Sequence, residues 1–286
     1  MTDSDRAPYV ELPESDIRLA TPWPFLLLVV GWSWLFWIPV LLLDWNMRAL
    51  PGSLLVAAGG ISPILAALIL NWLHETRALR RDFWRRTLDP RRISPPWLLV
   101  IILVPAGTAA AAVAAGTLAG GPTPDWQELL RFVHDPARSL LLIVFFLLFG
   151  PIPEEPGWRG YALDRLVARY DKIAASLILG LVWSVWHLPM FYIGGSLLAR
   201  RFEPGTLLFW LGWFVPVLGR TVIFTWVFYG TGRSILAVIL LHFLFNLVAE
   251  LVQLPPAMVL WRSCFEVLFA VVIVCRWWRS GRHGSG

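Results

Sequence analysis

The segment SLLLIVFFLLFGPIPEEPGWRGYALDRLVARY, residues 139–170, joins a long apolar run to a cluster of charged residues. Two adjacent glutamates, Glu154 and Glu155, follow directly after the apolar pattern, and Arg159 lies one helical turn beyond Glu155 on the same face. An ionised side chain at the centre of a bilayer costs about 2.5–3.5 kcal/mol on insertion scales. We therefore expect Glu154 to take part in chemistry, and Glu155 with Arg159 to hold it in place.

Composition places this segment in a membrane protein. Of the 286 residues, 57% are hydrophobic and 15% are charged, whereas soluble domains average about 45–50% apolar and about 25% charged residues. The composition predicts an all-α polytopic membrane protein. The formal net charge of +5 does not indicate nucleic-acid binding, because the basic residues cluster in loops beside apolar spans. The expected partners are membrane lipid and a protein or peptide substrate, with no nucleic acid.

The hydropathy pattern predicts about eight transmembrane helices in one bundle at residues 23–277, between a polar tail at 1–22 and a C-terminal tail at 278–286. The apolar part of the fourth span is shorter than the roughly 20 residues that a span needs, so its helix should continue into the glutamate motif. Three prolines in the motif predict a kink or a new helix start there. The expected spans are residues 23–43, 53–73, 97–118, 139 into the motif, 173–193, 206–228, 235–251 and 257–275.

The arginine-rich loop from His74 to Pro96 predicts the orientation. It holds seven arginines, and positively charged loops stay on the cytoplasmic side. Both termini are then cytoplasmic. Lipid or partner binding is the alternative interpretation of these arginines. The arginine-rich, lysine-poor composition favours a bacterial cytoplasmic membrane as the location.

Three polar residues within later spans complete a candidate catalytic set with Glu154. His187 lies in the fifth span, and His242 and Asn246 lie four residues apart in the seventh, on one helix face. Two histidines and a glutamate (Glu154, His187 and His242) are the ligand types of a catalytic zinc with an open position for water. A glutamate and a histidine also activate water without a metal, and an asparagine amide stabilises an oxyanion. Either route ends in hydrolysis.

Three motifs occur along the chain: EExxxR (Glu154, Glu155, Arg159), an aromatic residue four positions before a histidine (Trp183, His187), and HxxxN (His242, Asn246). In this order they resemble the motifs of the CPBP family of intramembrane proteases, the CAAX-processing and bacteriocin-processing (Abi) group related to Rce1-type prenyl-protein proteases. The resemblance covers residues 139–252, the expected protease core. Many members have Phe where this chain has Trp183.

The resemblance implies an eight-helix bundle with a cavity open to the cytoplasm. It further implies that Glu154 activates the catalytic water with His187, that His242 and Asn246 form the oxyanion or metal-binding side, and that Glu155 and Arg159 are supporting residues. A divalent metal such as zinc is a candidate cofactor. The chain has no HExxH, the usual zinc-peptidase signature.

The expected function is an intramembrane endopeptidase that cleaves near the terminus or the membrane-proximal segment of a protein or peptide. Two alternatives stay open: a non-catalytic immunity or scaffold protein, and a transporter that uses Glu154 and His187 as a proton relay. Packing is the ordinary role of Trp183. Arg220, deep in the sixth span, is expected to pair with a carboxylate such as that of Glu155 or Glu250, or to line the cavity.

Overall fold

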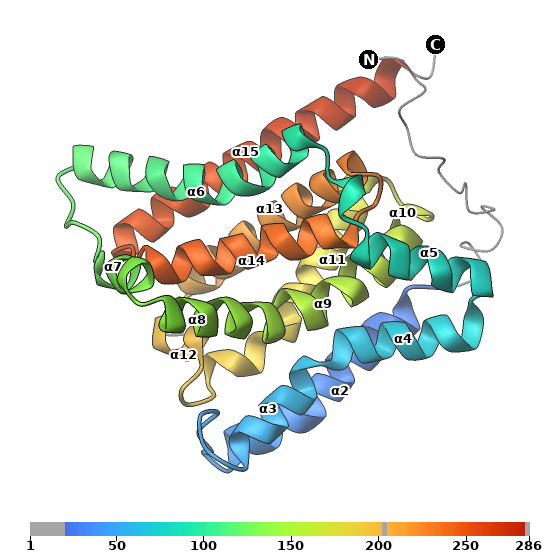
Figure 1. Ribbon diagram of the computed structural model, residues 1–286, viewed down its shortest axis with the longest axis horizontal. Helices are drawn as coiled ribbons and strands as arrows, with labels where there is room; N and C mark the ends of the chain where they lie inside the picture. The colour runs from blue at the N-terminus through green and yellow to red at the C-terminus, as the bar shows by residue number, and fades with distance from the viewer. Residues whose placement is uncertain (1–20, 202–204, 284–286) are drawn as a thin grey trace.

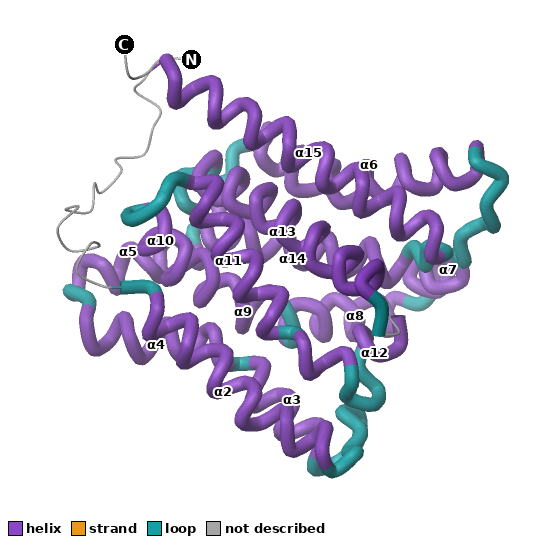
Figure 2. The backbone as a smooth tube through the Cα atoms, turned by 180° about the vertical axis from the view of Figure 1, so that it is seen from behind, coloured by secondary structure: helices purple, strands orange, loops and turns teal. Residues whose placement is uncertain are grey.

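The protein is a bundle of helices (Figures 1 and 2). The structure, a computed structural model, describes residues 21–201 and 205–283, and in these ranges it contains no strand beyond an isolated bridge between Asp125 and Gln253. The tails expected at 1–22 and 278–286 thus lie partly outside the described residues. The helices are α2 (Trp23–Leu42), α3 (Gly52–Gly60), α4 (Ser62–His74), α5 (Arg77–Leu88), η2 (Pro90–Arg92), α6 (Pro95–Leu118), α7 (Gln127–His134), α8 (Pro136–Leu148), α9 (Pro151–Gly157), η3 (Trp158–Leu163), α10 (Asp164–Val167), α11 (Lys172–Trp186), η4 (Leu188–Phe191), α12 (Leu197–Arg201), α13 (Leu207–Gly230), α14 (Ile235–Leu251) and α15 (Pro256–His283).

The helices confirm an all-α membrane protein, although not the count of eight spans. Five helical stretches in the described ranges are long and apolar enough to cross a bilayer, or six if the bent pair α3–α4 forms one span. The helices α11 and α14 are apolar but shorter. One of the five stretches runs from Pro136 to Val167, so the fourth span does continue through the glutamate motif. The last helix continues past residue 277 to His283.

The helix that carries the two glutamates lies inside the bundle. The helices α6 and α15 pack side by side along one edge, and α13 and α14 follow next to them (Figure 1). The helix α9 packs against α14 on one side and against α4 on the other, with α2 beyond α4. Glutamates on α9 are therefore screened from lipid by neighbouring helices.

The break between α3 and α4 is closed by polar side chains of α2. The two helices meet at an angle of 43°, which leaves backbone carbonyls of α3 without partners inside their own helix. In a membrane such groups need partners from the protein. Three side chains of α2 donate to carbonyls near the end of α3: Trp32 to Ala58 (2.9 Å), Ser33 to Gly59 (2.7 Å) and Trp37 to Val56 (3.0 Å).

A buried charged cluster ties three segments together at one end of the bundle. Asp164, at the start of α10, accepts hydrogen bonds from Arg86 of α5 (3.2 Å) and from Arg233 in the turn between α13 and α14 (2.5 Å). Arg165 pairs with Glu75 in the same region. Burial alone would lower the pKa of Arg233, but the attraction of Asp164 raises that pKa above its ordinary value. The cluster therefore stays charged, and it places the arginine-rich loop and the end of the glutamate motif on the same side.

Arg220 has a different partner from the ones expected. Its guanidinium donates to Glu266 of α15 at 2.7 Å, and Glu266 also pairs with Arg262 at 3.1 Å. The expected carboxylate partner is present, but it is Glu266 instead of Glu155 or Glu250. Helix α15 supplies the carboxylate because it packs directly against α13, a proximity that sequence spacing does not reveal.

Candidate active site

The two glutamates are presented by a new helix start. Helix α8 ends at Leu148 and α9 begins at Pro151, in agreement with the break predicted from the prolines. Pro151 suits the first position of a helix because its missing N–H needs no partner there. Glu154 is 6% exposed and Glu155 is fully buried. Beyond Gly157 the helix widens into the π-helical turn η3, a distortion that often marks functional sites.

Glu155 connects Arg159 to His242. The Arg159 guanidinium donates to Glu155 at 2.9 and 3.0 Å, and the imidazole Nδ1 of His242 lies 2.7 Å from the Glu155 carboxylate. All three side chains are buried. The guanidinium also lies over the rings of Trp183 (5.0 Å) and Phe224 (4.8 Å). The predicted intrahelical ion pair is present, and it extends across the bundle to the histidine of α14.

Trp183 joins the remaining groups. Its indole N–H donates to the carboxylate Oε2 of Glu154 at 2.7 Å. Its ring makes edge-to-face contacts with His187 (centroids 5.7 Å apart) and with His242 (5.4 Å apart). Groups from α9, α11 and α14 thus surround one indole, which brings together the three segments that the motifs predicted to meet.

The hydrogen bonds define the tautomer of each imidazole. The Nδ1 atom of His187 lies 2.9 Å from the Trp183 carbonyl, and Nδ1 of His242 faces a carboxylate. Carbonyl and ionised carboxylate oxygens only accept hydrogen bonds, so both Nδ1 atoms carry the proton. In the neutral form of each imidazole, the lone pair then lies on Nε2. His187 takes its position because α11 ends at Trp186 and Pro189 follows within the next turn.

Asn246 lies one helical turn beyond His242, beside the start of the glutamate helix. Its amide is close to Gly150, where an added Cβ would lie only 3.2 Å from the Nδ2 atom. In the described part of the chain this amide makes no hydrogen bond to another protein group. The structure therefore places a free amide donor near the element that carries Glu154, without direct contact to the carboxylate.

The donor types suit a metal, but their placement does not. Two Nε2 lone pairs and a carboxylate are ligands that zinc accepts. Within residues 21–201 and 205–283, however, no three histidine, cysteine, aspartate or glutamate side chains stand together at ligand spacing. As placed, Glu154, His187 and His242 do not form a metal-ligand set.

Sequence reasoning underestimated Trp183 and missed Phe224. Trp183 was expected to be a packing residue, yet it donates the hydrogen bond that holds Glu154. A buried indole N–H usually has a hydrogen-bond acceptor, and this rule could have predicted a polar partner for Trp183. Phe224 of α13 contacts both Arg159 and His242; nothing in the sequence singles it out among the many apolar residues of that helix.

Comparison with known proteins agrees with this site. The model of a family described as type II CAAX prenyl endopeptidase Rce1-like matches residues 136–248, a range that contains all seven motif residues. The chain is also 28% identical over 201 residues to CAAX prenyl protease 2 from Methanococcus maripaludis, which covers 70% of this chain and 73% of that protein. Residues 136–248 of the chain are therefore similar to the Rce1-like family. This similarity indicates a peptidase, an endopeptidase embedded in the membrane, and it confirms the resemblance inferred from residues 139–252.

Proposed function

We propose that this Rce1-like protein hydrolyses a peptide bond near the terminus or membrane-proximal segment of a membrane-associated substrate, with Glu154 as the base that activates water. Further parts of the proposal are that a water-filled cavity reaches the site from the cytoplasm and that the arginine-rich loop and both termini face that side. The charged cluster around Asp164 supports this orientation, because it gathers the basic segments at one end of the bundle. Reporter fusions at each terminus test it.

The site chemistry suggests the order of proton transfers. Glu154 takes a proton from a water that also donates to an imidazole Nε2, and the water oxygen bonds to the peptide carbonyl carbon. The Asn246 amide donates to the oxygen that becomes negative. When the C–N bond breaks, Glu154 returns the proton to the leaving amine. Glu155 and Arg159 hold His242 in the tautomer that keeps its Nε2 lone pair available.

One observation carries this proposal: Glu154, His187 and His242 contact the same buried indole, that of Trp183. A polar set of this kind within a bilayer is unfavourable unless its members face one another or water. The proposed steps use protein side chains and water alone, since the described side chains are not spaced as metal ligands.

A cleavage assay with purified protein in proteoliposomes tests the proposal. The name of the archaeal relative suggests the probes: two peptides that end in a CAAX sequence, one with a farnesylated cysteine and one unmodified. Mass spectrometry detects new termini. Glu154→Ala, His187→Ala and His242→Ala should each abolish cleavage while the protein stays folded, whereas His134→Ala, in an exposed position outside the site, should retain it. Full activity in one of the three variants would remove that residue from the site.

A further inference from the structure

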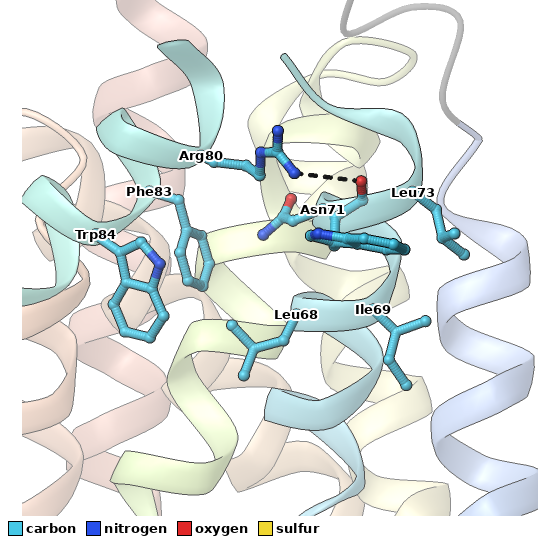
Figure 3. Close-up of a pocket in the computed structure, with 8 residues that line it drawn as sticks. Leu68, Ile69, Asn71, Leu73, Arg80, Phe83 and Trp84 are labelled. Atoms are coloured by element: carbon cyan, nitrogen blue, oxygen red, sulfur yellow. Dashed lines mark hydrogen bonds between the residues drawn. The ribbon is translucent and has the colours of Figure 1, made fainter. Parts of the chain in front are cut away.

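A crevice between α4 and α5 lies outside the candidate active site. Its volume is about 570 Å³, within the roughly 300–1,000 Å³ of small-molecule sites. Leu68 and Ile69 lie at one end of it, Asn71 and Arg80 lie at the other, and Phe83 forms one wall (Figure 3). The crevice is therefore apolar at one end and polar at the other.

Asn71 brings an unused donor to the polar end. The side chain is 7% exposed, and its buried Nδ2 atom has no hydrogen-bond partner in the described protein. The amide faces the crevice, beside Arg80 and Phe83 (Figure 3). A buried donor left without a partner is unfavourable, because it has lost its hydrogen bonds to water. An amide in this position is suited to an acceptor that enters from outside the protein.

Arg80 brings positive charge that the protein does not neutralise. Among the described residues, its guanidinium makes a single hydrogen bond, a long one of 3.4 Å to the Trp72 carbonyl. The acidic residues of this segment already have other partners: Glu75 pairs with Arg165, Asp82 with Arg86, and Asp89 with Arg91. Among the described residues, no carboxylate pairs with Arg77, Arg80, Arg81 or Arg85. The polar end of the crevice therefore carries a local positive excess that attracts an anion.

The rim of the crevice indicates the depth of the site in the bilayer. Trp72 is 71% exposed and Trp84 is 45% exposed, and exposed tryptophans are enriched at the boundary between lipid tails and headgroups. An occupant would have its charged group at this boundary and its apolar part along Leu68 and Ile69. This is the shape and polarity of a phospholipid rather than of a soluble ion.

We propose that this crevice binds an anionic phospholipid, with the phosphate held by Arg80 and the Asn71 amide and one acyl chain lying over Leu68 and Ile69. Basic pockets at the cytoplasmic ends of membrane helices are suited to such headgroups. The ring of Phe83 also lies close to the glutamate segment, because an added Cβ on Gly160 would lie 2.8 Å from it. The lipid would thus sit behind the segment that carries Glu154, without touching a residue of the proposed catalytic set.

Lipid-induced thermal stabilisation of the purified full-length protein tests this proposal. The probes are phosphatidylglycerol and phosphatidylcholine with the same acyl chains, each added to the detergent-solubilised protein. Phosphatidylglycerol should raise the unfolding temperature more than phosphatidylcholine does. Arg80→Gln and Asn71→Leu should each weaken the apparent affinity for phosphatidylglycerol, Arg80→Gln by about tenfold or more because a charge-assisted contact is lost.

The matched control is Arg77→Gln, which removes the same charge from the same helix outside the crevice and should keep the phosphatidylglycerol response. Asn71→Leu also controls for folding: it deletes a donor without a partner, so its unfolding temperature without added lipid should not fall. Three results would overturn the proposal: equal stabilisation by the two lipids, an equal loss in Arg77→Gln and Arg80→Gln, or full stabilisation by glycerol phosphate, which has no acyl chain.

Discussion

Trp183→Phe is the substitution that tests the site geometry most directly. The change keeps an aromatic ring beside His187 and His242, but it removes the N–H that donates to Glu154 at 2.7 Å. The carboxylate loses the donor that orients it, so the proposed base is displaced from the attacking water. Many members of the CPBP family have Phe at this position, so the Trp183→Phe protein is expected to fold.

The magnitude follows from the type of contact. A hydrogen bond to a charged group contributes about 1.5–3 kcal/mol, which corresponds to a roughly 10- to 150-fold change in rate. The loss should appear in kcat with little change in KM, because the indole orients the base rather than the substrate. The measurement is the rate of appearance of new termini from the CAAX-type peptide in proteoliposomes.

Trp186→Phe is the matched control. Trp186 lies on the same helix, is similarly buried, and donates to the Ser33 hydroxyl at 2.6 Å instead of to Glu154. Both substitutions delete one buried indole donor, so their effects on thermal unfolding should be similar. Equal kcat values for Trp183→Phe and Trp186→Phe would refute the positioning role of Trp183.

Three further predictions concern the same region. Glu155→Gln should lower the unfolding temperature and activity together, because it leaves the buried guanidinium of Arg159 unneutralised at a cost of about 3–5 kcal/mol; an unchanged thermal scan would contradict this. Gly157→Ala should destabilise the protein by about 1–3 kcal/mol, because the added Cβ would lie 2.5 Å from the Pro63 carbonyl oxygen, and chemical denaturation measures it. Cleavage should withstand o-phenanthroline, because no three described side chains are spaced as metal ligands; inhibition that added zinc reverses would assign a metal to the site.

Much of the site could be predicted because its residues are chemically conspicuous. Charged and imidazole side chains are rare within apolar spans, so Glu154, Glu155, Arg159, His187 and His242 stood out without knowledge of the fold. The helix break before α9 could also be predicted from the sequence, because three prolines disturb the hydrogen bonding of a continuous helix. The partners were less accessible: Arg220 pairs with Glu266, 46 residues away, and Trp183 holds Glu154, 29 residues away.

The sequence alone therefore determined that the chain is a helical membrane protein and where the helix that carries the glutamates starts. It also identified the polar side chains that are unusual within membrane spans. Packing decided the rest: that the Trp183 indole meets the carboxylate of Glu154, that His242 is linked through Glu155 to Arg159, and that an unpartnered amide and an unpaired arginine share a crevice between α4 and α5. The physical reason is that hydropathy and helix-breaking residues act over a few neighbouring positions. Hydrogen bonds between helices depend on rotations and crossings that only the assembled bundle specifies.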